Sequence, residues 1–409
     1  MTVQVAGVHM QPFQKPGQHA PYRVMGRAAI NGALQDAGLN PDNIQQAYAS
    51  YIYGDTGCGQ HVLYDALQTG IPVFNVNNAC CSGSSALYLA RQAILSGQAD
   101  CVLAFGFEDM QPGALESTWP DRENAGQRIN HMLDTQQIPG GPMAPRWFGA
   151  AGQHYLDTYN ASPDLFAHVA VKTRQHAAAN PHALFRTPIS VEEVMASPRI
   201  YGNYLNRLMC CPPSCGAAAA VLVSERFAKR HGIRHGVEIL GQTMVTDTEQ
   251  SWQTPMEAVG QTMVSKAAAD LYEQGGIGPE DIDVIELHDC FTPNEVLSYE
   301  NLGLCEQGGA TQLVADGNNT YGGQWVINPS GGLMSKGHPI GATGLAQCTE
   351  LVKQLRGQAE QRQVPNARIA LQHNIGLVAG VVLTLYGHCL LYTSPSPRDQ
   401  RGSRMPSSA

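Results

Sequence analysis

Residues 75–108, NVNNACCSGSSALYLARQAILSGQADCVLAFGFE, hold the pattern that decides the fold. Two adjacent cysteines, Cys80 and Cys81, stand in a turn of small polar residues, ahead of an apolar helical pattern that ends at Gly97 and a strand pattern after it. A helix beginning at this turn directs its free N–H groups and positive dipole end at the cysteines, which favours thiolate over thiol. The pattern fits either an activated nucleophile or buried structural cysteines, and composition does not distinguish the two residues.

The same α/β unit occurs a second time along the chain. GLNPDNI at 38–44 returns as GIGPEDI at 276–282, and an apolar strand follows each copy. A small-residue turn, a helix and another strand then complete each unit, the second through HPIGATGLAQCTELVKQLRG and ARIALQHNIG. The repeat predicts an internally duplicated α/β fold, with halves at 1–245 and 246–388.

Two segments depart from the repeat. Residues 111–205 are rich in Pro, Gly, Gln and His, and we interpret them as an inserted loop domain that contributes to ligand binding. Residues 389–409 shift abruptly to Ser, Pro and Arg without an apolar period, which predicts a disordered tail foreign to the domain.

Bulk composition excludes several classes of function. Only 14% of the 409 residues are charged and the net charge is −9, without a basic cluster before the tail, which argues against a nucleic-acid partner. No run approaches ~18 apolar residues, and the first residues lack a signal-peptide pattern, so we expect a soluble intracellular protein without integral membrane association. Eleven cysteines in so long a chain are expected to be free thiols.

Three further stretches carry groups that could do chemistry. HDCF at 288–291 ends an apolar strand, where α/β sheets place ligands, although a buried core histidine is the plainer interpretation. SGGLMSKGHPIGATG at 330–344 is a glycine-dense loop in which His338 could act as a base, or whose backbone could cradle a phosphate. QHNIG at 372–376 lies on the second-half strand that corresponds, in the repeat, to the strand carrying AFGFE; the plainer interpretation is an ordinary transition from a strand to a turn. CCPPSC at 210–215 lacks zinc-ligand spacing.

Together these stretches, in this order, resemble the thiolase superfamily, and most closely its sterol carrier protein 2 (sterol carrier protein x) branch. The resemblance covers residues 3–387 and rests on NVNNACCSGS, HDCF and NTYGGQWVINPSGGLMSKGHPIGATGLAQC. It implies the thiolase fold, in which two duplicated α/β halves form α-β-α-β-α layers with an inserted loop domain. Three departures from the family pattern are Cys215 at a commonly acidic position, Val378 and Ala379 at glycine positions, and the lack of a C-terminal sterol-carrier domain.

Roles for individual residues follow from this resemblance. Cys80 would be the nucleophile, His338 its base and Cys290 the second acid/base. His288 and His338 would line a first oxyanion hole, and the backbone N–H groups of Cys80 and Gly376 a second one. Substrate and CoA would contact Ser330, Gly331, Lys336 and Asn374.

The resemblance also implies an activity and its partners. The expected reaction is thiolytic cleavage of a 3-oxoacyl-CoA by ping-pong acyl transfer, in β-oxidation of fatty acids or sterol side chains. CoA would be a substrate, and neither a metal nor another cofactor would be needed. We expect a homodimer, in the cytoplasm of a bacterium or the peroxisome of a eukaryote. The alternatives are a thiolase-like steroid side-chain aldolase or lyase, and a non-catalytic lipid-binding or lipid-transfer protein.

Overall fold

Strands and helices alternate through two halves of the chain in a computed structural model that describes residues 2–111 and 121–388. The first half contains β1 (Val3–Met10), α1 (Tyr22–Ala37), β2 (Gln46–Ser50), α2 (Cys58–Leu63), β3 (Val73–Val76), α3 (Ser82–Leu95), β4 (Cys101–Glu108), β7 (Gly216–Ser224) and α8 (Glu225–His231). The second half contains β8 (Val237–Val245), α9 (Pro255–Ala258), α10 (Gln261–Gly275), β9 (Val284–Glu286), α11 (Thr292–Asn301), α12 (Ala310–Ala315), β10 (Val326–Ile327), α13 (Thr343–Leu355), β11 (Ile369–Gly376) and β12 (Gly380–His388). The predicted tail lies outside the described residues.

The repeated phrase forms the same local structure in both halves. Gly38 ends α1 and Gly276 ends α10, each in the left-handed region, with φ values of 66° and 63°. A short 3-10 turn follows, in which the side chain of Asn43 or Asp281 accepts a hydrogen bond from a backbone N–H three residues earlier, at 2.9 Å in both copies. Equivalent residues therefore terminate a helix and start a strand by the same physical means.

The strand order displays the duplication directly. Ten strands form one sheet in the order β10-β9-β11-β12-β8-β1-β7-β4-β2-β3. Each half contributes five neighbours in the same relative order, and the halves meet where β1 pairs antiparallel with β8. Because β8 occupies the place in the second half that β1 occupies in the first, the repeated strand order begins again at β8, while the 245/246 domain boundary stays a prediction.

Three separate apolar cores define the predicted α-β-α-β-α layers. The central core joins the inner faces of the sheet to α3 and α13, with Val5, Leu87 and Leu351 among its members. A second core lies under α1 and includes Ile30, and a third lies under α10 and includes Leu271. Helices α3 and α13 are thus enclosed between the two halves.

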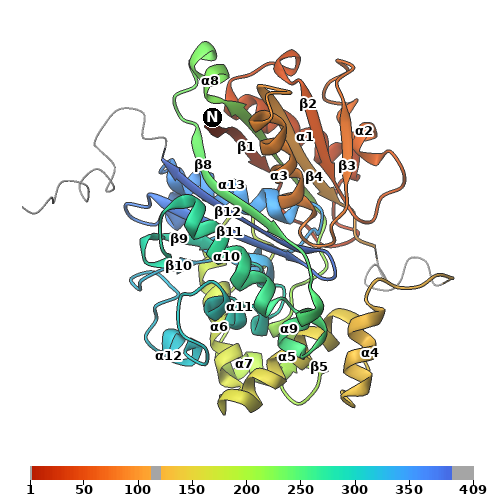
Figure 1. Ribbon diagram of the computed structural model, residues 1–409, viewed down its shortest axis with the longest axis vertical. Coiled ribbons are helices and arrows are strands. Elements are labelled where there is room, and N and C mark those ends of the chain that lie inside the picture. Colours follow the sequence, from red (N-terminus) through yellow and green to blue (C-terminus); the bar gives the residue numbers. More distant parts are fainter. Residues whose placement is uncertain (1, 112–120, 389–409) are drawn as a thin grey trace, which may run out of the picture.

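The inserted segment packs on the other half of the molecule. It contains α4 (Gln127–Thr135), α5 (Met143–Tyr159), α6 (Asp164–Ala178), α7 (Val191–Ala196), β5 (Arg199–Tyr201) and β6 (Leu205–Asn206). Figure 1 shows these elements gathered beside α9 and α11 of the second half, at the end of the molecule away from α1 and α2. Among residues 2–111 and 121–388, no helix is long and apolar enough to cross a bilayer.

Glycines let the starts of α3 and α13 touch. A Cβ on Gly83 would lie 3.0 Å from the backbone nitrogen of Gly344, and a Cβ on Gly344 would lie 2.2 Å from Oγ of Ser84. A Cβ at Gly344 has no room, and one at Gly83 would push its neighbour aside, so the close approach depends above all on Gly344. The contact brings the turn that carries Cys80 next to the loop that carries His338.

We predict that Gly344→Ala destabilises the protein by about 1–3 kcal/mol, because the added methyl group has no room between the two helix starts. Denaturant unfolding followed by circular dichroism measures the change. Gly140→Ala is the matched control, since a Cβ at Gly140 would meet nothing within 4 Å. Equal stability of the two variants would contradict the proposed contact.

Candidate active site

Cys80 lies in a tight turn between β3 and α3. Ala79, directly before it, has a φ of 45°, which is uncommon for a residue with a side chain. The turn is fixed to the first turn of α3, since the Asn78 N–H donates to Ser82 Oγ at 2.7 Å and the Asn78 amide donates to Ser85 Oγ at 3.0 Å. This arrangement holds Cys80 at the start of the helix.

The structure distinguishes the two adjacent cysteines. Cys81 is fully buried, and its thiol donates a hydrogen bond to the Asn78 carbonyl at 3.0 Å. Cys80 is only partly buried, and its Sγ lies within 4.8 Å of a nitrogen of both His288 and His338, which also lie within that distance of each other. Cys80 is therefore the cysteine that the tertiary structure combines with the two imidazoles.

His338 is held so that one ring nitrogen faces the site with a free lone pair. Its Nδ1 lies 2.7 Å from the hydroxyl of Thr343, and that hydroxyl donates its single hydrogen to the Pro339 carbonyl at 3.0 Å. With the Thr343 hydrogen on the Pro339 carbonyl, Nδ1–H of His338 donates to Thr343 Oγ1 and Nε2 is unprotonated. Nε2 is buried without a hydrogen-bond partner in the described part of the chain. Burial lowers the pKa of His338 to about 3, so the ring is a neutral base.

His288 lies at the end of β9 and faces His338 edge-on, with ring centroids 5.1 Å apart and an interplanar angle of 84°. Burial lowers the pKa of His288 well below its ordinary value, and the positions of His338 and His373 lower it further. The amide of Asn374 on β11 lies 3.0 Å from His288 Nδ1. Two neutral imidazoles therefore meet at Cys80, one from each loop that the sequence singled out.

Cys290 adds a second thiol to the same region. Burial raises its pKa well above the ordinary value, and Cys211 and Cys80 are close enough to raise it further. The backbone N–H of Cys211 donates to the Cys290 carbonyl at 2.8 Å. Sequence reasoning treated Cys211 only as part of an unconvincing metal pattern, and no local signal places it beside HDCF.

One expectation about Cys80 is wrong. The helix start was expected to favour its thiolate, yet burial raises the pKa of Cys80 to about 12, and the nearby Cys81 and Glu108 raise it as well. Burial disfavours the charged form of a thiol, and the residue at the N-cap position of α3 is Cys81. Cys80 is a thiol at rest, so an adjacent base must take its proton.

Comparison with known proteins places this geometry in a family. The thiolase N-terminal domain matches residues 3–197, and the thiolase C-terminal domain-like family matches residues 245–385. Sterol carrier protein 2 of Oryctolagus cuniculus is 49% identical over 93% of this chain and 71% of that protein. This chain belongs to the thiolase family.

Other similar proteins extend the comparison. The benzoylsuccinyl-CoA thiolase subunit BbsB of Thauera aromatica is 36% identical over 91% of this chain and 94% of that protein. The solved structure of the Ltp2-ChsH2(DUF35) aldolase superposes with a TM-score of 0.82 at 25% identity, covering 96% of this chain and 99% of that chain. The solved structure of human mitochondrial 3-ketoacyl-CoA thiolase superposes with a TM-score of 0.71 at 17% identity, covering 95% of this chain and 99% of that chain, which confirms the thiolase fold predicted from the sequence.

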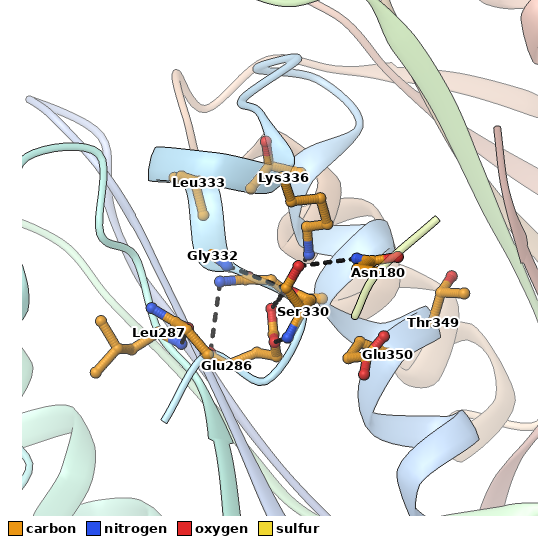
Figure 2. A network of polar contacts seen from close by, with 12 residues as sticks. Asn180, Glu286, Leu287, Ser330, Gly332, Leu333, Lys336, Thr349 and Glu350 are labelled. Carbon is orange, nitrogen blue, oxygen red and sulfur yellow. Dashed lines mark hydrogen bonds and ion pairs between the residues drawn. The ribbon is translucent and has the colours of Figure 1, made fainter. Parts of the chain in front are cut away.

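Ser330 and Lys336, two of the predicted CoA contacts at the glycine-dense loop, take part in a buried polar network, drawn in Figure 2. Lys336 is fully buried, and its ammonium lies 3.2 Å from a Glu286 carboxylate oxygen. That carboxylate also accepts from the hydroxyl of Ser330 at 2.7 Å and from its N–H at 3.0 Å, while Asn180 of α6 donates to the Ser330 carbonyl at 2.8 Å. The side chains of Ser330 and Lys336 thus have partners within the protein.

The two remaining glycines of the prediction pack closely against other elements. A Cβ on Gly331 would lie 2.5 Å from Cβ of Ala177, so this residue lets the loop contact α6. A Cβ on Gly376 would lie 2.4 Å from the Asn78 carbonyl oxygen, and the Gly376 N–H interacts with the Cys81 thiol. Gly376 therefore adjoins the nucleophile turn, and its place in an oxyanion hole stays a prediction.

Three positioning groups were not found from sequence. Thr343 orients His338, and Ser214 Oγ accepts from the His338 backbone N–H at 3.0 Å. Glu108 accepts from the backbone N–H groups of Tyr53 and Gly341 at 3.0 and 2.9 Å, which ties the first half to the His338 loop. Burial raises the pKa of Glu108 to about 7. The only sequence signal that could have indicated Glu108 was its place as a polar residue at the end of a strand.

We predict that alkylation of Cys80 by iodoacetamide keeps accelerating up to pH 10, by nearly tenfold per pH unit. Only the thiolate reacts, and with a pKa of about 12 the thiolate fraction of Cys80 is still increasing throughout this range. Peptide mapping by mass spectrometry measures the rate at each pH, with Cys80→Ala to assign the peptide. A rate that levels off near pH 8 would show a lowered pKa and contradict this result.

Proposed function

We propose that this thiolase-family protein is an active acyltransferase that cleaves 3-oxoacyl-CoA to acyl-CoA and acetyl-CoA or propionyl-CoA. Two observations carry the proposal: a ring nitrogen of His338 lies within 4.8 Å of Cys80 Sγ, and Nε2 of that ring is buried without a hydrogen-bond partner in the described part of the chain. A neutral thiol next to a neutral, oriented imidazole is the pair that general-base activation of a nucleophile requires.

The first half-reaction forms an acyl-enzyme. Cys80 Sγ attacks the keto carbon of the substrate while its proton moves to His338 Nε2. Negative charge develops on the former keto oxygen, where His288 is positioned to stabilise it. The C–C bond then breaks, the keto group re-forms as a thioester on Cys80, and the departing enolate of acetyl-CoA takes its proton from the Cys290 thiol.

The second half-reaction returns the enzyme to its initial state. The Cys290 thiolate takes the proton of an incoming CoA thiol, whose sulfur attacks the thioester on Cys80. Collapse of the adduct releases the shortened acyl-CoA, and the Cys80 sulfur recovers its proton from His338. CoA is a substrate, and the proposed reaction needs neither a metal nor a redox cofactor because the substrate thioester stabilises the enolate.

A second candidate function is aldol cleavage, supported by the similarity to the aldolase structure. A retro-aldol reaction needs a base and an oxyanion donor but no covalent intermediate. A third candidate, lipid binding without catalysis, is suggested by the name of the sterol carrier protein 2 relative. Formation of a thioester on Cys80 separates the thiolase reaction from both.

We expect the full chain, incubated with a 3-oxoacyl-CoA, to gain the mass of the shortened acyl group, because Cys80 carries that group until CoA arrives. Intact-protein mass spectrometry measures the gain. Cys80→Ala should show none, and added CoA should discharge the adduct from the unmutated protein. Absence of an acyl-sized gain in the unmutated protein would refute the thiolase proposal.

Cys290→Ala is the informative control for this experiment. Acylation of Cys80 from acetyl-CoA expels a CoA thiolate and no enolate, so this variant should still form an adduct from acetyl-CoA. From 3-oxoacyl-CoA the adduct should form at least about 100-fold more slowly, because the enolate lacks its acid. In the reverse of the proposed deacylation Cys290 also protonates the CoA thiolate that acetyl-CoA expels, but a thiolate leaves without an acid far more readily than an enolate does. Equal loss from both donors would therefore contradict the part assigned to Cys290 in protonating the enolate.

We also propose that the protein is a homodimer formed through β3, and that it works in a reducing compartment such as the cytoplasm of a bacterium or the peroxisome of a eukaryote. Strand β3 is the last of the ten-stranded sheet, and Phe74 on it is 48% exposed. An uncovered edge strand with an exposed aromatic side chain is a surface for pairing. The ten cysteines within the described residues are all free thiols, which fits the compartment.

We predict that Phe74→Asp converts the dimer to a monomer, because it places a charge on the pairing edge. Light scattering after size-exclusion chromatography gives the mass. Met143→Asp is the control, since Met143 is also an exposed apolar residue, 39% exposed, but lies on α5. A monomeric unmutated protein, or dissociation caused by both variants, would contradict this interface.

A further inference from the structure

A chain of buried hydrogen bonds leads from the start of α13 to His288. It begins at Gln372 on β11, whose side-chain nitrogen donates to the Gly344 carbonyl at 2.7 Å and to Ser84 Oγ at 2.8 Å. The side-chain oxygen of Gln372 accepts from the Tyr386 hydroxyl at 2.5 Å. Because a carbonyl oxygen can only accept, the Gly344 carbonyl fixes which end of the Gln372 amide is nitrogen.

The direction of each later hydrogen bond follows from this anchor. Ser84 Oγ accepts from Gln372, so the Ser84 hydrogen is donated to Oδ1 of Asn374 at 2.7 Å. With Oδ1 of Asn374 accepting, its Nδ2 is the atom that faces His288 Nδ1 at 3.0 Å. Nδ2 can only donate, so Nδ1 of His288 accepts and the proton of the neutral ring lies on Nε2.

We propose that Gln372, Ser84 and Asn374 are positioning residues that hold His288 as its Nε2–H tautomer, with Tyr386 supporting Gln372. The role that this inference assigns to His288, donation of a hydrogen bond to the oxyanion, rests on the proposed thiolase function. The tautomer itself follows from the hydrogen bonds alone. The hydrogen bond between the His288 ring and Asn374 uses Nδ1, which leaves the Nε2–H for a substrate oxygen.

The two imidazoles beside Cys80 then have opposite protonation. His338 carries its proton on Nδ1, against Thr343, and presents a lone pair at Nε2. His288 presents an N–H at Nε2. One ring can accept the proton of the thiol while the other donates to the developing oxyanion, and neither has to exchange a proton first. The proton on His288 also occupies the position that a metal ion would need on this ring.

Burial makes the chain of hydrogen bonds favour one tautomer of His288. Ser84, Gln372, Asn374 and Tyr386 are all fully buried, so water cannot replace a lost partner. The other tautomer of His288 would set Nδ1–H against the N–H group of Asn374 and leave two donors facing each other. A buried mismatch of that kind corresponds to a preference of roughly 10- to 100-fold for the observed tautomer.

The chain of hydrogen bonds also joins the two halves of the molecule. Ser84 belongs to α3 of the first half, whereas Gln372, Asn374 and Tyr386 belong to β11 and β12 of the second. Ser84 reaches Asn374 at the point where Gly344 leaves no room for a side chain. The protonation of His288 therefore depends on correct packing of α3 against α13.

The test is 15N NMR of the full chain labelled at the histidine ring nitrogens, without substrate. His288 is assigned by comparison with His288→Gln. In the unmutated protein we expect the shifts of a neutral ring protonated at Nε2. Asn374→Asp replaces the donor by an acceptor of the same size, so it should move the proton to Nδ1, and Ser84→Ala should yield a mixture of tautomers.

Thr349→Val is the matched control for Ser84→Ala. Thr349 is a buried hydroxyl residue of α13 that donates only to the Leu345 carbonyl, at 2.8 Å, so its loss should leave the His288 spectrum unchanged. A His288 protonated at Nδ1 in the unmutated protein would overturn the inference. An unchanged tautomer in both Asn374→Asp and Ser84→Ala would overturn it as well.

A kinetic measurement separates this inference from the proposed function. Ser84→Ala should slow acylation of Cys80 by 3-oxoacyl-CoA roughly 10- to 100-fold with little change in KM, because His288 donates mainly in the transition state. If the NMR spectra are as expected but the unmutated protein is not acylated, the tautomer is supported and the thiolase proposal is refuted. An unchanged acylation rate in Ser84→Ala would overturn the part assigned to Ser84.

Discussion

The contact between the starts of α3 and α13 is the constraint on which the rest of the structure depends. Gly83 and Gly344 allow the two backbones to meet, where a side chain on either would lie 3.0 Å or less from its neighbours. Everything proposed to be catalytic is arranged around this crossing. Cys80 enters from the turn before one helix and His338 from the loop before the other, so a small separation of the helices would part the nucleophile from its base.

Exclusion of water gives the site its electrostatic character. Burial raises the pKa of Cys80 to about 12 and lowers that of His338 to about 3, so both groups are neutral at physiological pH. A neutral pair costs less to bury than an ion pair. The proton can then move when the substrate carbonyl is attacked, at the moment when the new negative charge has a hydrogen-bond donor nearby.

Buried carboxylates hold the loops that carry these groups. Glu108 of the first half accepts from the Gly341 N–H of the His338 loop, and Glu286 pairs with Lys336 just before His338. Asp289, next to His288, accepts from the Leu333 N–H at 2.6 Å. Burial raises the pKa of Asp289 to about 8. The inserted segment completes this frame, since Asn180 of α6 reaches the Ser330 carbonyl.

The sequence by itself determined the duplicated α/β fold and the loops that meet at the site, because helix ends, turns and apolar periods are local signals repeated in both halves. The family resemblance, which the comparison confirms, implied the layers and proposed roles for Cys80, His288, Cys290 and His338. Only the tertiary structure decided that Cys80 is a resting thiol and that Lys336 pairs with Glu286. The protonation of each histidine was likewise decided there. These properties depend on burial and on hydrogen bonds between residues far apart in the chain, such as Ser84 and Asn374, which no local pattern encodes.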